Sequence, residues 1–189
     1  MSGYSAKLAD LRKLNSEYAS LPDEHHGWKL SRNFVAGKGP ADAKLMLIGQ
    51  APGANEDVQK SPFVGRSGKL LTEALSKGGI DRKKVYITSV VQFFPPKNRM
   101  PSRKEIELCR PFLLRQIEII KPRFVILLGN VALSAVLVKG KVREEHGKIV
   151  KKGHTTYFIT FHPAAALRST GTKRMFLEDI EKFAAIASI

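Results

Sequence analysis

Three short segments carry side chains that could act on a ligand, and the first of them follows a hydrophobic stretch. Residues 49–57 (GQAPGANED) break a buried-strand pattern with Pro and Gly, so they could present backbone N–H groups to a ligand. Gln50 is a neutral amide at a place where an enzyme would often put a carboxylate. Taken alone, the segment favours an ordinary strand-to-loop turn, because it lacks both the Walker spacing and the dinucleotide fingerprint.

The other two segments add an aromatic ring and a histidine. Phe63 lies among small residues in SPFVGRSG and could stack on a base, although a core position is the commoner fate of a phenylalanine. His162 comes directly after a predicted strand, in ITFHPAAALR. A histidine there can donate a hydrogen bond to developing negative charge, titrate, or cap the strand end. The remaining histidines show no metal-ligand spacing with carboxylates or with the single cysteine.

The elements that must position these residues alternate between strands and helices. Hydrophobic periodicity predicts an N-terminal amphipathic helix, four strands of which the last is fed by a hairpin, and helices between and after them. This order predicts a three-layer α/β/α sandwich around a central, mostly parallel four-stranded sheet. Ligands of such sheets bind beyond the carboxyl ends of the strands, so the loops after Ile48, Val91 and Phe161 should meet at one edge.

Composition bounds the kind of protein. A chain of 189 residues suits one domain, and its net charge of +15 suggests a polyanionic partner, most simply nucleic acid. The longest apolar runs are far too short to cross a bilayer, and the N-terminus has no secretory pattern. We therefore expect no membrane partner and a cytoplasmic or nucleoid-associated location. A single cysteine excludes an internal disulfide.

Five motifs in order resemble the uracil-DNA glycosylase superfamily, and most closely its family-four branch. That branch reads approximately G-E-A-P-G-x-x-E-D, P-F-V-G-R-x-G-x-L-L, Y-I-T-N-V-V, N-R-x-P and H-P. The matching segments cover most of the chain from about residue 32 onward: 49–57, 62–71, 86–91, 98–101 and 162–163. The resemblance implies one glycosylase-like domain over residues 1–189, in which a helix and loop at 1–31 stand in place of the cluster-binding region.

The resemblance also implies that the protein flips a damaged base out of DNA and hydrolyses its N-glycosidic bond. By carry-over, Phe63 stacks on the flipped base, Glu56 crowds the 5-methyl position and so excludes thymine, and His162 stabilises the leaving uracil anion. The catalytic residues implied are His162 and Gln50. The base-binding residues implied are Gly49, Ala51, Glu56, Phe63 and Ser89, and the DNA contacts are Arg66, Arg99, Arg168 and, as a wedge between bases, Leu167.

The family's iron–sulfur cluster is not expected here, because its ligands are missing. The family holds the cluster on four cysteines, of which the first two would fall in the segment LPDEHHGW. Phe93 stands at the third position, and only Cys109 remains. One cysteine cannot hold such a cluster, so we expect no metal and no cofactor. Phe93, Trp28 and the N-terminal helix are expected to pack in the region that the cluster would have braced.

Two further departures affect the base pocket. Ser89 stands where the family has asparagine, whose amide can pair with both O4 and N3–H of uracil. A serine hydroxyl serves as one partner or the other, so discrimination between uracil and cytosine should weaken. Gln50 replaces the family-four glutamate, and Ala51 stands where the family-one motif G-Q-D-P-Y has the aspartate that handles the water. Neither usual carboxylate is present.

Two functions therefore stay open. The first is a monofunctional, metal-independent glycosylase of base excision repair, acting on DNA that contains uracil or another deaminated base, with Gln50 positioning a water; we expect it to be a monomer. The second is a non-catalytic or weakly active DNA-binding lesion sensor that retains the base pocket. A nucleotide-processing hydrolase for a small molecule is a third function, which the charge excess disfavours.

Overall fold

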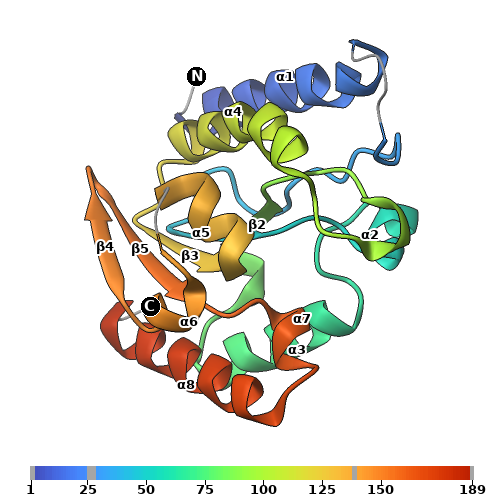
Figure 1. Ribbon diagram of the computed structural model, residues 1–189. Coiled ribbons are helices and arrows are strands. Elements are labelled where there is room, and N and C mark those ends of the chain that lie inside the picture. Colours follow the sequence, from blue (N-terminus) through green and yellow to red (C-terminus); the bar gives the residue numbers. More distant parts are fainter. Residues whose placement is uncertain (1–2, 25–28, 138–139, 188–189) are drawn as a thin grey trace.

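The computed structural model describes residues 3–24, 29–137 and 140–187 (Figure 1). Within these residues five strands form one sheet, in the order β2-β1-β3-β5-β4. The strands are β1 (Leu45–Gly49), β2 (Val85–Ser89), β3 (Phe124–Leu128), β4 (Ile149–Lys152) and β5 (Thr155–Thr160). All run parallel except β4, which pairs antiparallel with β5. The mostly parallel sheet is confirmed, but the predicted count of four strands was one too low.

The strand that the prediction left out differs from the others in burial. Every residue of β1, β2 and β3 is buried, as in strands covered on both faces; β1 and β3 are continuous apolar runs, whereas β2 ends in Thr88 and Ser89. Every residue of β4 is exposed, and its second half is Lys151–Lys152. Lysines on a short edge strand discourage further strand pairing. The predicted hairpin is correct, and its first arm joins the sheet.

Helices cover both faces of the sheet. Helices α1 (Gly3–Glu24), α4 (Arg103–Ile120) and α5 (Gly129–Leu137) pack on one face, and α3 (Arg66–Lys77) and α8 (Thr170–Ala187) on the other (Figure 1). The shorter helices are α2 (Ala54–Gln59), α6 (Val142–Glu145) and α7 (Pro163–Ala166), and 3-10 turns span Arg82–Lys84 and Pro96–Asn98. The predicted three-layer α/β/α sandwich is confirmed.

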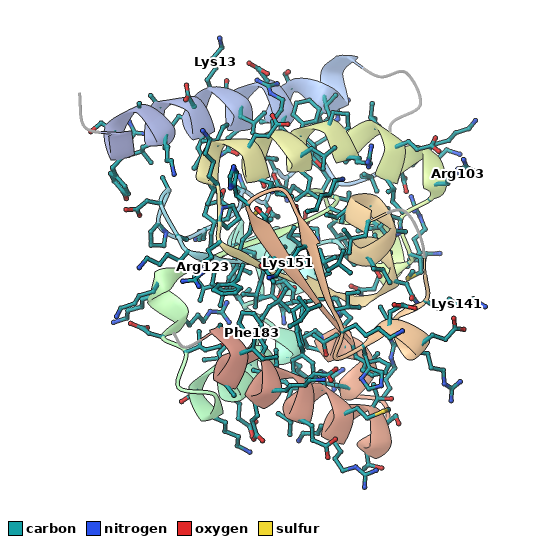
Figure 2. The ribbon with its side chains drawn as sticks, turned by 90° about the vertical axis from the view of Figure 1, so that its left-hand side faces the viewer. Lys13, Arg103, Arg123, Lys141, Lys151 and Phe183 are labelled. Atoms are coloured by element: carbon teal, nitrogen blue, oxygen red, sulfur yellow. The ribbon has the colours of Figure 1, made fainter. Side chains whose placement is uncertain are left out.

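Each interface between a helix layer and the sheet has its own apolar core. Under α8, Phe183 lies with its ring centroid 5.7 Å from that of Phe124 and 5.4 Å from that of Phe158. Figure 2 shows Phe183 on the side of α8 that faces the sheet. On the opposite face, the predicted apolar side of α1 is buried at Leu11, Leu14, Tyr18 and Leu21.

An aromatic cluster joins α1 to α4 and to the loop after β2. Phe93 is fully buried, and its ring centroid lies 5.4 Å from that of Tyr18 and 5.5 Å from that of Phe34. Phe112 of α4 stacks on Tyr18 at 4.3 Å. The predicted packing of Phe93 against the N-terminal helix is thus confirmed, whereas Trp28 lies outside the described residues.

Basic side chains are distributed over several faces of the molecule. Figure 2 labels Lys13 on α1, Arg103 on α4 and Lys151 on β4, which lie on different sides of the fold. This distribution matches a charge excess spread along the chain rather than gathered in a tail. None of the helices in the described residues has the length and apolarity needed to cross a membrane.

Candidate active site

The carboxyl ends of the four parallel strands lie at one edge of the sheet, as the predicted order requires. Gly49 at the end of β1 is the register partner of Ser89 at the end of β2. The pairing continues past the strands, because the N–H of Val90 donates to the Gly49 carbonyl at 3.0 Å and that of Val91 to the Gln50 carbonyl at 3.1 Å. The loop after β1 is thereby fixed to the segment that follows Ser89.

His162 follows β5 and caps the short helix α7. Its Nδ1 accepts a hydrogen bond from the backbone N–H of Ala164 at 3.1 Å. An accepting Nδ1 carries no proton, so in the neutral ring the proton lies on Nε2. Nε2 is buried and has no hydrogen-bond partner among the described residues. A buried donor without a partner is costly and calls for a ligand or a water.

The surroundings of His162 keep it neutral. Burial, and secondarily the positive charge of Arg168, lower the pKa of His162 to about 4. Of the roles open to this histidine, hydrogen-bond donation is therefore supported, and titration near neutral pH is not. Gly129, at a φ of +90°, allows the close approach of the β3 loop, because a Cβ there would lie 2.9 Å from Cβ of His162.

Phe63 lies beside His162, with the two ring centroids 5.8 Å apart and the planes tilted by 33°. The phenylalanine ring also covers Gly49, where an added Cβ would come within 2.5 Å of it. Phe63 is 8% exposed and belongs to the core cluster under α3 and α8. It is thus both a core residue and a wall of the site, and its stacking on a base stays a prediction.

Glu56 ties together the two loops on either side of it. One carboxylate oxygen accepts from the backbone N–H groups of Val64 at 2.9 Å and Gly65 at 2.7 Å, and the other accepts from that of Gly53 at 3.1 Å. The family resemblance gave Glu56 the role of excluding thymine, which stays a prediction. The contacts show that Glu56 also has a structural role, because its carboxylate holds the loop of Phe63 against the loop after β1.

Ser89 is buried at the end of β2. Its hydroxyl lies close to Gly49, because a Cβ added to that glycine would be 3.3 Å from the Ser89 oxygen. The residue before Ser89, Thr88, belongs to a buried polar network that was not predicted from the sequence. Thr88 Oγ donates to Gln116 Oε1 at 3.0 Å, the Gln92 amide donates to Thr88 Oγ, and the Gln116 amide donates to Gln92 Oε1 at 3.3 Å. A fully connected buried network fixes the backbone next to Ser89.

Gln50 and Ala51 are half-buried in the loop after β1. The Gln50 amide makes no hydrogen bond with the described residues, so it is available to a water or a base. Asp57, to which the sequence analysis gave no role, has one oxygen bound to the Asn33 amide at 3.2 Å. Its Oδ1 is buried without a partner among the described residues and can accept from a water.

The four predicted DNA contacts differ in how free their side chains are. Leu167 is 45% exposed directly after α7, as a wedge requires, and Arg168 lies close enough to His162 to affect its pKa. Arg66 is exposed at the start of α3. Arg99 is already paired, because its guanidinium donates to both oxygens of Glu105 at 2.8 and 2.6 Å. A phosphate would have to compete with that carboxylate.

The residues present do not fit an iron–sulfur cluster. Cys109 is the one cysteine of the chain; it is buried, and burial raises the pKa of its thiol to about 11. Phe93, which the family resemblance puts at the position of a further ligand, is an aromatic residue buried against Tyr18. Within the described ranges no three His, Cys, Asp or Glu side chains are arranged to hold a metal ion.

Comparison with known proteins agrees with this arrangement. The family model of the uracil DNA glycosylase superfamily matches residues 36–184. A type-4 uracil-DNA glycosylase of Pyrobaculum aerophilum is 40% identical over 183 residues, which cover 92% of this chain and 93% of the relative. The type-4 enzyme of Thermotoga maritima is 44% identical over 79% of this chain and 81% of its own length. A type-5 uracil-DNA glycosylase of P. aerophilum is 29% identical over 78% and 73% of the two chains. The chain therefore belongs to the uracil-DNA glycosylase superfamily.

Proposed function

We propose that the protein is a DNA glycosylase that flips out a deaminated base, uracil first of all, and hydrolyses its N-glycosidic bond. The observation that carries this proposal is the buried Nε2–H of His162, which has no partner among the described residues and lies on a ring next to Phe63. A flipped base stacked on Phe63 would bring its oxygens to this donor. Family membership and the names of the relatives support DNA as the substrate.

The neutral histidine suits the stabilisation of a leaving base anion. As the N-glycosidic bond breaks, negative charge develops on the departing base, and a fixed donor in a water-poor site stabilises that charge. Because the N–H of Ala164 holds Nδ1, the ring needs no reorientation to present Nε2–H. The proton stays on His162, and the base leaves as an anion that is hydrogen-bonded to it.

The attacking water has weak help in this site. Gln50 can orient a water through its amide but cannot take its proton, and Glu56 is occupied by three backbone N–H groups. Loss of a general base costs on the order of 10²- to 10⁴-fold in rate. An oxocarbenium-like transition state needs little nucleophilic assistance, so we propose slow but real turnover rather than none.

The weak assistance to the attacking water also supports a second candidate function. Since Gln50 cannot take a proton and Glu56 is occupied by three backbone N–H groups, the protein could bind a flipped base and release it unchanged, as a lesion sensor. The net charge of +15 would serve DNA binding in either case. We further propose that the protein acts as a monomer in the cytoplasm or on the nucleoid.

One experiment separates the two candidates. The protein is incubated with oligonucleotides that carry a single uracil, hypoxanthine or xanthine, and abasic sites are scored after alkaline cleavage. We expect release of uracil in an amount that grows with time and with enzyme. Tight, salt-sensitive binding of the same oligonucleotides without release of any base would contradict the glycosylase and support the sensor.

A further inference from the structure

The backbone of Phe63 is in a conformation that phenylalanine rarely adopts. Its φ is +53°, in the left-handed region, where a side chain other than that of glycine is strained. Such strain persists only where the surroundings hold the residue in place, and it is common at functional sites. The orientation of the ring over Gly49 and beside His162 therefore depends on whatever holds this peptide.

Arg82 makes the contacts that hold the Phe63 peptide in this conformation. One guanidinium nitrogen donates to the Phe63 carbonyl at 2.9 Å and to that of Pro62 at 3.4 Å. The other donates to the Gly68 carbonyl at 3.2 Å and to the Thr72 hydroxyl at 2.6 Å. The planar fork of arginine thus joins the carbonyl of Phe63 to the first two turns of α3, which a lysine ammonium could not do with the same geometry.

The other side of the same turn is held by Glu56, which accepts the N–H groups of Val64 and Gly65. Gly68 completes the arrangement, because a Cβ there would lie 1.8 Å from the Phe63 carbonyl oxygen. One cation therefore binds the carbonyl of Phe63, and one anion binds the two N–H groups that follow it. This pair leaves the Phe63 peptide little freedom to relax.

We propose that Arg82 is a positioning residue for base recognition, which fixes the strained peptide of Phe63 so that its ring is ready to stack on the flipped base. The inference rests on the proposed function, since it assigns Arg82 a role in the same site. The hydrogen bonds of Arg82 are to the Phe63 loop and to α3. Its effect on the reaction passes through Phe63.

Because Arg82 borders a pocket open to solvent, its role can be tested by chemical rescue. Arg82 lines a solvent-open pocket of about 780 Å³ beside the edge strand β2, together with Lys38 and Lys83. A small cation can enter such a pocket and replace a missing side chain. Added guanidinium, at concentrations well below those that unfold proteins, should therefore restore part of the activity of Arg82→Ala. Lys83→Ala is the matched control, because it removes a cation from the same pocket but no contact to the Phe63 loop.

The experiment compares wild type, Arg82→Ala, Arg82→Lys and Lys83→Ala in single-turnover uracil release and in binding to undamaged duplex. We expect Arg82→Ala to slow release by about 10- to 100-fold, the effect of misplacing a reacting group by about 1 Å, with unchanged duplex affinity. Arg82→Lys should recover little, guanidinium should recover more, and Lys83→Ala should match wild type. In a Phe63→Ala background, Arg82→Ala should cause little further loss.

Hydrogen exchange of backbone amides tests whether Arg82 holds the Phe63 loop, and this measurement does not depend on catalytic activity. The amides of Val64 and Gly65 should exchange faster in Arg82→Ala and Arg82→Lys than in wild type or Lys83→Ala. Equal losses from Arg82→Ala with and without Phe63, or unchanged exchange of these amides, would overturn the inference. If wild type releases no base from any lesion, the proposed function fails and with it the role in catalysis, while the exchange result still decides whether Arg82 holds the loop.

Discussion

The backbone N–H of Ala164 donates to Nδ1 of His162 across 3.1 Å, and this contact leaves Nε2–H as the group that His162 can offer to a ligand. Because Nε2 is buried and the pKa of the ring is lowered to about 4, the histidine is a neutral donor over the whole physiological range. This state has consequences for both activity and stability.

The rate of base release should show no titration of His162 between about pH 6 and pH 9. The folded protein binds a proton at His162 only near pH 4, so the donor keeps the same charge across this range. Single-turnover rates on one uracil oligonucleotide, measured at constant ionic strength, provide the check. An acid limb centred near the ordinary histidine pKa of 6.5 would show that the ring titrates during turnover.

The same shift predicts a loss of stability in mild acid. Below pH 6.5 the unfolded chain binds a proton at this histidine, whereas the folded chain does not until about pH 4. The free energy of unfolding should therefore fall as the pH drops through this window, by up to about 3 kcal/mol from His162 alone. Urea unfolding of wild type and of His162→Gln isolates the contribution, since the variant should lack this part of the slope. Parallel slopes in the two proteins would contradict the assignment.

Ser89→Asn should sharpen the preference for uracil. The restored amide can accept from N3–H and donate to O4 of uracil, while the donor and acceptor of cytosine are reversed at these positions. Two measurements show the change: the ratio of the binding constants for oligonucleotides that carry uracil or cytosine at the same position, and the rate of uracil release. Ser76→Asn on the exposed side of α3 is the control and should change neither. Loss of uracil release in Ser89→Asn would mean that the pocket is built around another base.

Arg168 and Arg99 should differ in their contribution to DNA binding. Arg168→Ala should weaken binding to duplexes of any sequence and reduce the slope of log K against log salt by about 1, because one phosphate contact is lost. Arg99→Ala should have a smaller effect, since its guanidinium is already paired with Glu105. Lys151→Ala on edge strand β4 serves as the control. A larger loss from Arg99→Ala than from Arg168→Ala would reverse the assignment.

Phe93→Ala should destabilise the fold by about 3–5 kcal/mol, the usual cost of truncating a fully buried aromatic side chain. The expected cause is a cavity between Tyr18 and Phe34, which both contact its ring. The midpoint of denaturant unfolding, at constant m-value, measures the loss, and Met100→Ala on the exposed loop is the control. A loss no larger than that of the control would mean that the aromatic cluster does not brace this region.

Elements with a buried apolar pattern could be predicted from the sequence, and elements without one could not. Strands β1 and β3 are continuous apolar runs and β2 begins as one, so the hydrophobic pattern found them, and the parallel order then placed His162 and the loop after β1 at one edge. Strand β4 is exposed and ends in two lysines, so its sequence has no core pattern by which to count it in the sheet.

The supporting contacts of the site were beyond sequence pattern. Arg82 binds backbone carbonyls and Glu56 binds backbone N–H groups, and a backbone partner puts no constraint on residue type that a sequence displays. Thr88, Gln92 and Gln116 form their network between β2, the loop that follows it and α4, and the sequence does not show that these polar residues face one another. Motif similarity identified the residues expected to touch the base but not those that hold them.

The central claim is that the donor of His162 stabilises a departing base, and a single-turnover assay tests it most directly. Uracil release from a single-lesion duplex is compared for wild type and His162→Ala, with the affinity of each protein for the same duplex measured in parallel. We expect measurable release by wild type, loss of that release in the variant by about 10²-fold or more, and nearly equal affinity. Release at the wild-type rate by His162→Ala would contradict the leaving-group role, and absence of release by wild type would contradict the glycosylase itself.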